Sequence, residues 1–328
     1  IKKSVASFGS GVITELDKEK GDAYVVTNCH VVYNDTAVNS YISDEIYLYL
    51  YGQDDDYNDR DYAIPATVVG VSSTYDIALL KVEGSEIIRS GTAVAAEFDD
   101  ADDVYVGETV YAIGNPERLG IAATQGIISK DSETIRVDIS SSDYNQNIKT
   151  YRVIRTDAAI NGGNSGGGLF NLEGKLAGIV NAKAASEDID NMGYALPSSN
   201  VRRLVELMHS QGYDGETGVE QAYLNASFSA KNRKTKYEND KLAIYETVYV
   251  TAAGDGLLAE DAVRHVKITD SQGNIYEDMD VTRLYHLDDA LLSARLGYTV
   301  TLTVSREGKT VEVPITLTKD NFINYDKI

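Results

Sequence analysis

The chain has 328 residues, enough for about two domains at roughly 150 residues each. Lys and Arg number 30 and Asp and Glu number 51, which gives a formal charge of −21. Because such a surface repels phosphate backbones, the composition argues against a nucleic acid partner. With 43% hydrophobic and 25% charged residues, the chain is expected to fold around a sizeable core.

The cysteine count and the start of the chain exclude further classes of protein. The single cysteine, Cys29, excludes an internal disulfide, and one Cys with four scattered His does not make a Cys-rich zinc site. We expect no metal and no other cofactor. No apolar run reaches the 18 or so residues of a membrane helix. Because no leader precedes Ile1 and Ile1 is not Met, we interpret the chain as a processed fragment, with any anchor upstream.

The first part of the chain, up to about Pro197, consists of short β-rich runs broken by Gly and by Asp or Asn clusters. This pattern predicts β-barrels or a sandwich. Strands are expected at 21–28, 45–51, 67–71 and 77–82. The acidic segment 97–103 separates two such stretches, about 1–85 and 104–197, and therefore predicts a boundary between two β subdomains.

A helix is expected to close this domain. Apolar residues recur at helical spacing from Val201 to Met208, with capping residues at 198–200 and Gly212 as a stop. The spacing predicts a helix over 199–211, and a domain that spans 1–212.

The remaining residues, 213–328, predict a smaller α+β module. Strand-like runs lie at 246–251, 299–304 and 310–317, and the pattern between them predicts a helix at 288–296.

A histidine is the usual general base at neutral pH, and this chain has four. His30 follows the apolar run 23–26, and an imidazole at the end of a buried strand needs a polar partner. We interpret His209, His265 and His286 as structural or solvated.

Five glycines surround Ser165 in the segment 161–168. A tight loop of this kind can direct successive N–H groups at one point and hold an oxyanion. A flexible turn or a phosphate cradle would use similar residues, although the Lys of a P-loop is absent.

Asp76 is a lone carboxylate at the start of the apolar run 77–82. Alone it would be interpreted as a turn residue. The chain order His30, Asp76, Ser165 is, however, the order of the hydrolytic triad in two-barrel β proteases. We therefore predict these three as the catalytic residues.

Several motifs occur in one order along the chain. They are Thr27-Asn28-Cys29-His30-Val31-Val32, Asp76-Ile77-Ala78-Leu79-Leu80-Lys81-Val82, Tyr111-Ala112-Ile113-Gly114-Asn115-Pro116 and Gly163-Asn164-Ser165-Gly166-Gly167. Together with segments 9–13 and 193–197 they resemble the HtrA (Deg) family of serine proteases. The resemblance covers most of residues 9–207. It implies a mainly β protein with a chymotrypsin-like double β-barrel protease domain.

The resemblance also implies an oxyanion hole formed by the N–H groups of Gly163 and Ser165.

It implies as well a substrate pocket for the residue before the cut, with a preference for smallish aliphatic side chains. Its residues would be Ile160, Asn161, Asn191, Met192, Gly193 and Tyr194.

The C-terminal module resembles a PDZ domain, with 300–314 as its closing hairpin and 288–296 as its groove helix. The peptide-binding loop would be Tyr223, Leu224, Asn225 and Ala226, where Asn225 and Ala226 replace the family's usual Gly and aliphatic residue.

For the whole protein, the resemblance implies a trypsin-like endopeptidase in protein quality control. Its partners would be unfolded or damaged proteins and peptides. We expect a homotrimer outside the cytoplasm, at the cell surface or secreted, with a membrane reached only through an N-terminal segment that this chain lacks. Two alternatives remain: a non-catalytic adaptor that captures peptides by strand addition, and a conditionally inactive chaperone.

Overall fold

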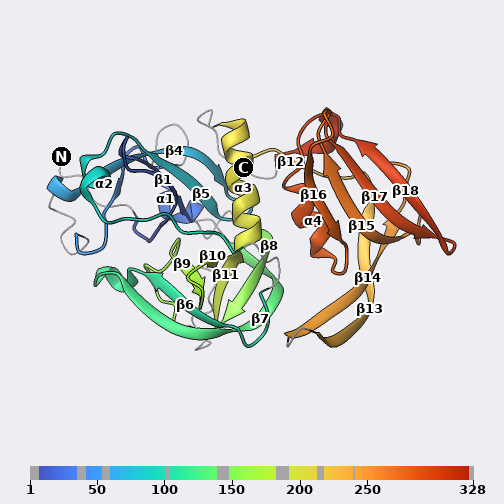
Figure 1. The fold of residues 1–328 in the computed structure, drawn as a ribbon, viewed down its shortest axis with the longest axis horizontal. Helices are drawn as coiled ribbons and strands as arrows, with labels where there is room; N and C mark the ends of the chain where they lie inside the picture. The colour runs from blue at the N-terminus through green and yellow to red at the C-terminus, as the bar shows by residue number, and fades with distance from the viewer. Residues whose placement is uncertain are drawn as a thin grey trace. The chain divides into compact units, whose positions relative to one another are not determined.

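A computed structural model describes residues 7–34, 42–53, 60–99, 104–138, 148–181, 192–212, 218–238 and 241–324. The chain forms two compact units, Ile1–Val219 and Glu220–Tyr325 (Figure 1). Both units consist mainly of β-strands, which confirms the predicted class. No helix in the described ranges combines the length and apolar character needed to cross a membrane.

The N-terminal half of the first unit is a five-stranded antiparallel sheet in the order β1-β2-β5-β4-β3. Its strands are β1 (Val12–Asp17), β2 (Asp22–Thr27), β3 (Ile46–Leu48), β4 (Ile64–Ser72) and β5 (Ile77–Val82). Short helical segments are α1 (Cys29–Val32), η1 (Arg60–Tyr62) and α2 (Glu86–Ser90). The central strand β5 is almost wholly buried, because both of its faces are covered and its sequence is apolar except for Lys81. The strand expected at 45–51 is shorter than predicted, because only Ile46–Leu48 pairs with β4.

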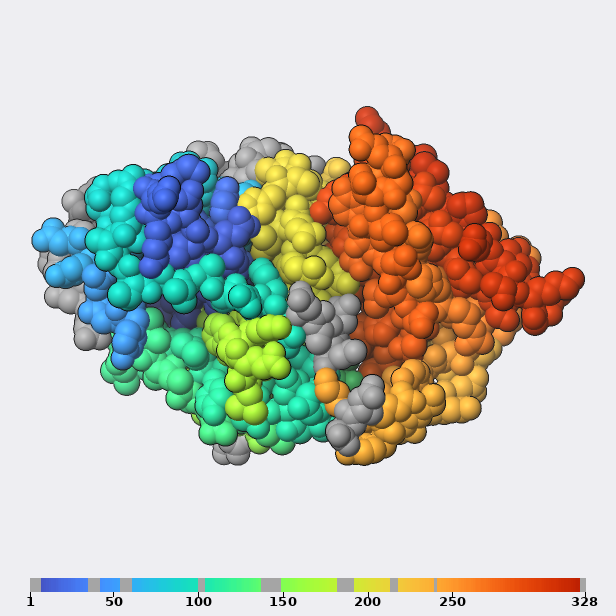
Figure 2. All heavy atoms as spheres, viewed as in Figure 1, coloured from blue at the N-terminus to red at the C-terminus, as the bar shows by residue number. Residues whose placement is uncertain are grey.

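The C-terminal half of this unit is a closed barrel in the order β10-β11-β8-β7-β6-β9. Its strands are β6 (Thr109–Gly114), β7 (Ala122–Asp138), β8 (Ile148–Thr156), β9 (Gly168–Asn171), β10 (Leu176–Val180) and β11 (Gly193–Pro197), with η2 (Pro116–Arg118) after β6. Figure 2 shows the residues of this half in green below the blue and cyan N-terminal half.

Helix α3 (Ser198–Gln211) follows β11 and begins one residue before the predicted start. Its apolar face is buried, and Met208 packs where Gly70 of β4 leaves room: a Cβ at Gly70 would lie 2.6 Å from Met208 Cγ. Gly212 ends the helix with a φ of +72° and donates its N–H to Met208 O. The helix therefore lies against both halves of the first unit, as Figure 1 shows.

The second unit is built on a sheet in the order β13-β14-β15-β17-β18, with β16 paired to β15. Its elements are β12 (Gln221–Ala222), β13 (Ser227–Glu238), β14 (Lys241–Ala252), β15 (Ala262–Thr269), β16 (Ile275–Asp280), α4 (Tyr285–Leu291), β17 (Thr299–Arg306), β18 (Lys309–Thr316), η4 (Lys319–Asn321) and β19 (Phe322–Ile323). Leu287 and Ala290 of α4 share one apolar core with Val248, Val266 and Leu302 of the sheet.

The helix predicted at 288–296 is wrong in its bounds. Helix α4 begins at Tyr285 and ends at Leu291. From Leu292 to Ala294 each N–H bonds three residues back, so the chain tightens into 3₁₀-type turns. The apolar pattern continues through these turns, which is why the sequence favoured a longer helix.

Candidate active site

His30 and Asp76 are in direct contact. His30 lies in α1 after β2, Asp76 lies just before β5, and the two strands pair side by side. His30 Nδ1 lies 2.6 Å from Asp76 Oδ2, and the His30 N–H donates to Asp76 Oδ1 at 2.8 Å. These two contacts fix both the position and the orientation of the imidazole.

The Asp76 carboxylate is buried, with 1% of its surface exposed. Asn181, directly after β10, donates its side-chain amide to Asp76 Oδ2 at 2.8 Å and to Tyr151 Oη at 2.8 Å. Burial, and then the negative charge of Asp76, raise the pKa of Tyr151 above its usual range, so the phenol stays neutral. A buried carboxylate that accepts three hydrogen bonds is compensated for its lost hydration.

Asp76 has a left-handed backbone, with a φ of +54°. This conformation costs energy for most residues other than Gly, although Asp adopts it more readily than most. The side-chain amide of Asn28 donates to the carbonyl of Asp76 at 2.8 Å and holds the turn from the other side. The local strain is therefore balanced by contacts that aim the carboxylate at His30.

Ser165 lies in the glycine-rich loop that precedes β9, and 5% of its surface is exposed. The loop passes close to the end of β2: a Cβ at Gly166 would lie 2.3 Å from Thr27 Oγ1 and 3.1 Å from Asn28 N. Only glycine fits there, with a φ of +83°. The fold thus brings Ser165 next to the segment that carries His30.

The two N–H groups predicted as oxyanion donors lack a protein acceptor within the described part of the chain. The carbonyl of Gly162 accepts from Glu117 N at 2.8 Å, and the carbonyl of Asn164 accepts from Gly167 N at 2.9 Å. In a trans peptide the carbonyl and the N–H point in opposite directions. These anchors therefore turn the N–H groups of Gly163 and Ser165 away from the contacts that hold the loop, which leaves them able to bind an anionic oxygen.

Ser165 Oγ and His30 are not hydrogen-bonded to each other in this structure, and Ser165 Oγ has no other hydrogen bond among the residues described. Catalytic hydrogen bonds are often long in unliganded enzymes and tighten when substrate binds.

Five of the six predicted pocket residues are described, and Asn191 lies outside the described residues. Ile160 packs on Gly193, where an added Cβ would lie 2.5 Å from Ile160 Cδ1. Tyr194 is buried and donates its hydroxyl to Met192 Sδ at 2.8 Å. Asn161 accepts from the Asn164 N–H within the nucleophile loop.

In the second unit, the predicted peptide-binding loop is tied down by its neighbours. The Tyr223 N–H donates to Asn321 O, and Leu224 is buried in the core. The Asn225 N–H donates to the carboxylate of Asp255 at 2.7 Å. Ala226 packs against the same core as a partly buried residue.

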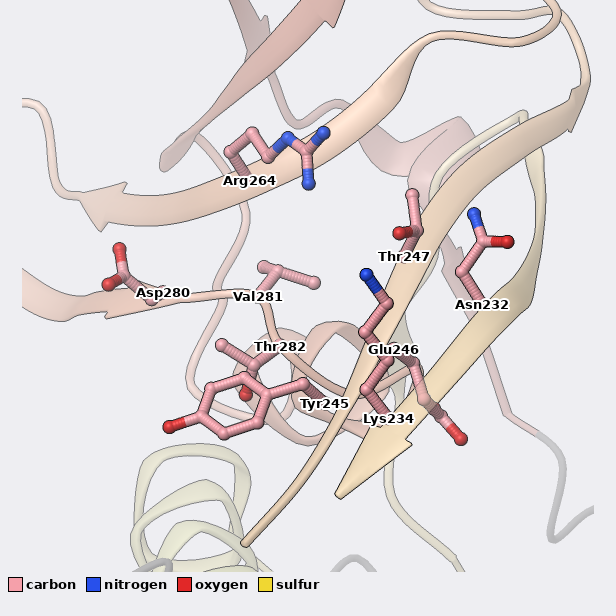
Figure 3. Close-up of a pocket in the computed structure, with 9 residues that line it drawn as sticks. All are labelled: Asn232, Lys234, Tyr245, Glu246, Thr247, Arg264, Asp280, Val281 and Thr282. Carbon is pink, nitrogen blue, oxygen red and sulfur yellow. The ribbon is translucent and has the colours of Figure 1, made fainter. Parts of the chain in front are cut away.

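The second unit also carries a polar pocket of about 680 Å³ on β13, β14 and β15 (Figure 3). Lys234 and Arg264 extend into it, while Glu246 is ion-paired with Arg233 and Asp280 with His265. Its lining holds no Ser, Cys or His, so it offers no serine or cysteine nucleophile and no imidazole base.

Three positioning contacts were missed from the sequence. They involve Asn181, which supports Asp76, Glu117, which anchors the Gly162 carbonyl, and Ser10, which bonds to Gly163 O and Ser165 O. Asn181 alone had a local signal: it is a polar residue at the end of the apolar run 176–180, the same context that marked His30.

The chain is similar to known serine proteases. Residues 9–179 match the trypsin-like peptidase domain family. The Do-like serine protease HtrA of Bacillus subtilis is 31% identical over 324 residues, covering 94% of this chain and 63% of that protein. The periplasmic serine endoprotease DegP of Escherichia coli is 32% identical over 314 residues, covering 95% of this chain and 57% of that protein. The chain thus spans less than two thirds of either relative.

A solved structure supports the fold. The serine endoprotease from Yersinia pestis aligns with a TM-score of 0.50 at 25% identity, covering 96% of this chain and 91% of that one. This likeness confirms the predicted chymotrypsin-like fold of the protease part. The chain belongs to the HtrA family of trypsin-like serine proteases.

Proposed function

We propose that the chain is a serine endopeptidase in which Ser165, His30 and Asp76 form the catalytic triad. The observation that carries this proposal is the 2.6 Å contact between His30 Nδ1 and the buried Asp76 carboxylate, beside a loop that presents Ser165. Asp76 holds the proton on Nδ1 and leaves Nε2 as the base.

In the first step Ser165 Oγ attacks the peptide carbonyl while His30 Nε2 takes its proton. The negative charge that develops on the substrate oxygen is stabilised by the N–H groups of Gly163 and Ser165. Each such donor contributes on the order of 100-fold to 1,000-fold in rate. The anchored carbonyls of Gly162 and Asn164 support this role, because they hold both donors in place before substrate arrives.

In the second step His30 returns its proton to the leaving amine, and an acyl-enzyme on Ser165 remains. Water then attacks the ester with His30 as base, and the peptide acid leaves. Asp76 stabilises the imidazolium in both halves, and Asn181 keeps the carboxylate in position.

The pocket for the residue before the cut is formed, in this proposal, by Ile160 and Asn161 on one side and by 191–194 on the other. The close packing of Ile160 on Gly193 narrows this space. A narrow apolar pocket favours smallish aliphatic side chains over large or charged ones.

We propose that the second unit, residues 213–328 in the sequence-based division, is a PDZ-like peptide-binding module. Strand β13 is an edge strand of its sheet, which leaves one side available for addition of an extended peptide. The Asn225 N–H is already occupied by Asp255, so main-chain pairing with β13 is the mode of binding that we favour.

For the whole protein we propose unfolded or damaged proteins as substrates, a homotrimer as the assembly, and a location outside the cytoplasm. DegP is named as a periplasmic enzyme, which supports this location. The acidic surface, with a formal charge of −21, supports protein rather than nucleic acid partners.

One observation favours a second candidate, a conditionally inactive peptide-binding chaperone. Ser165 Oγ is not hydrogen-bonded to His30 in this structure. In that state the chain would hold unfolded peptides without cutting them until the triad closes.

The test compares wild type with Ser165→Ala on casein and on a serine-directed fluorophosphonate. We expect cleavage and labelling by wild type and loss of both in the variant. If wild type binds casein but neither cuts it nor becomes labelled, the protease proposal fails and the chaperone is favoured.

A further inference from the structure

Ser10 connects the nucleophile loop to the rest of the first unit through four hydrogen bonds. Its Oγ donates to Gly163 O at 2.7 Å and accepts from Asn115 N at 2.8 Å. Its N–H donates to Ser165 O at 2.7 Å, and its carbonyl accepts from Thr27 Oγ1 at 2.7 Å. One half-buried serine thus joins the β6 end of the barrel, the nucleophile loop and strand β2 of the N-terminal sheet.

We propose that the Ser10 hydroxyl is a positioning residue for the oxyanion hole. This inference rests on the proposed protease function. Ser10 touches neither substrate nor the reacting atoms; it acts through the peptide between Gly163 and Asn164.

The reason lies in the three consecutive peptide planes of the loop. The plane before Gly163 is held by Glu117 N, and the plane before Ser165 is held by Gly167 N. The plane between them carries the Gly163 carbonyl, and its outside contact is the Ser10 hydroxyl. Its own N–H makes a longer bond of 3.1 Å to Asn161 O within the loop.

Each pair of neighbouring planes is joined by only two rotatable dihedrals. If the middle peptide can rotate, the angle between the two peptides that carry the Gly163 and Ser165 N–H groups can therefore change. A pair of donors that no longer matches one oxygen loses stabilisation of the transition state, whereas binding of the ground-state peptide changes little.

The space around Ser10 fits a specific role for the hydroxyl. A Cβ at Gly114 would lie 3.0 Å from Ser10 Oγ, and a Cβ at Gly166 would lie 2.2 Å from Ser10 O. Backbone therefore approaches this residue closely from two sides.

The test measures casein cleavage at increasing substrate concentration for wild type, Ser10→Ala and Ser10→Thr. For Ser10→Ala we expect kcat to fall about 10-fold to 100-fold, because partial misplacement costs less than loss of a donor, with KM little changed. Ser10→Thr keeps the hydroxyl and is expected to recover most of kcat.

A second readout isolates the oxyanion hole. A peptide aldehyde adds to a catalytic serine and places an oxygen where the oxyanion forms. We expect Ser10→Ala to weaken aldehyde inhibition by a factor similar to its loss in kcat, and to leave competitive inhibition by the matching peptide amide unchanged.

Ser85→Ala is the matched control, because Ser85 caps α2 through a side-chain bond to Ile88 N. It is expected to lower the melting temperature and leave kcat unchanged. If Ser10→Ala lowers only the melting temperature, or changes KM alone, the inference is wrong while the protease proposal stands. If wild type is as inert as Ser165→Ala, the proposed function fails and takes this inference with it.

Discussion

The side-chain amide of Asn181 lies 2.8 Å from Oδ2 of Asp76, the carboxylate oxygen that also faces His30. Asn181 comes from the barrel and Asp76 from the N-terminal sheet, so the contact crosses between the two halves of the first unit. Because the same amide also donates to Tyr151, it cannot rotate without losing two bonds. The barrel therefore determines how the carboxylate of the other half is oriented.

Replacement of Asn181 by Ala is expected to lower the rate of fluorophosphonate labelling about 10-fold. The Asp76 carboxylate then loses one of its donors and is free to turn from His30. The variant is also expected to lose about 1–3 kcal/mol of stability, the usual cost of an unsatisfied buried group. Asn181→Asp should be worse, because two buried carboxylates would share one site.

Asn171→Ala is the control for this prediction. Asn171 also donates a side-chain amide to a carboxylate, Asp99 at 2.9 Å, but has no contact with the triad. It should lower the melting temperature without slowing labelling. Equal labelling rates for Asn181→Ala and wild type would remove Asn181 from the positioning network.

Gly163→Ala is expected to reduce casein cleavage by about 100-fold or more. Gly163 has a φ of +95°, and an added Cβ would lie 2.2 Å from Asn115 O. The peptide plane must move to relieve this overlap, and its N–H moves with it.

Gly174→Ala separates backbone strain from displacement of the loop. Gly174 also has a positive φ, +76°, but an added Cβ meets no atom within 4 Å. We expect this variant to lose about 1–2 kcal/mol of stability and to keep its activity. A fully active Gly163→Ala would contradict the assignment of its N–H as an oxyanion donor.

The candidate triad could be predicted from the sequence because each residue had an unusual local context. His30 and Asp76 are polar residues at the ends of apolar strands, and Ser165 lies among glycines. Ser10 had no such signal. Its partner Gly163 is far away in the chain, so the contact exists only after both halves of the unit have folded.

The prediction of helix bounds from the sequence was limited in a similar way. Helix α3 was predicted to within one residue at its start, because its apolar period and the stop at Gly212 agree. The helix expected at 288–296 was misplaced, because buried apolar residues occur both in α4 and in the turns that follow it. Periodicity reports which residues face the core and does not report whether the hydrogen bonds span three residues or four.

Asp261→Asn is expected to destabilise the second unit at pH 7 by about 1–3 kcal/mol. The buried Asp261 carboxylate accepts two bonds from Arg306, at 2.9 and 2.7 Å, and one from Leu258 N at 2.8 Å. The Arg306 hydrogen bonds lower the pKa of Asp261, although burial opposes them. In the unfolded chain the pKa of an Asp is about 3.9, and in the folded protein the pKa of Asp261 is lower. The stabilisation is therefore complete above about pH 3.9 and is lost as the pH falls through the folded pKa.

Melting curves at pH 7, 5 and 3 check this prediction. The difference between wild type and Asp261→Asn should be full at the two higher values and narrow at the lowest. Glu260→Gln is the control, since the neighbouring Lys231–Glu260 pair is exposed and should contribute less than about 0.5 kcal/mol. A difference that grows toward low pH would mean that the sign of the linkage is wrong.

The second unit is expected to bind a peptide amide at least as tightly as the same peptide with a free C-terminal carboxylate. The Asp255 carboxylate already occupies this loop: it accepts from the Asn225 N–H at 2.7 Å and from Asn225 Nδ2 at 3.3 Å. A second carboxylate at this loop would meet a like charge.

Asp255→Asn removes that charge, and we expect it to improve binding of the free acid relative to the amide about five-fold, which corresponds to roughly 1 kcal/mol. Fluorescence anisotropy with the two forms of one labelled β-casein decapeptide measures the ratio, and Glu312→Gln on β18, the opposite edge strand, controls for overall charge. A wild-type preference for the free acid would show instead that a terminal carboxylate displaces Asp255 from the loop.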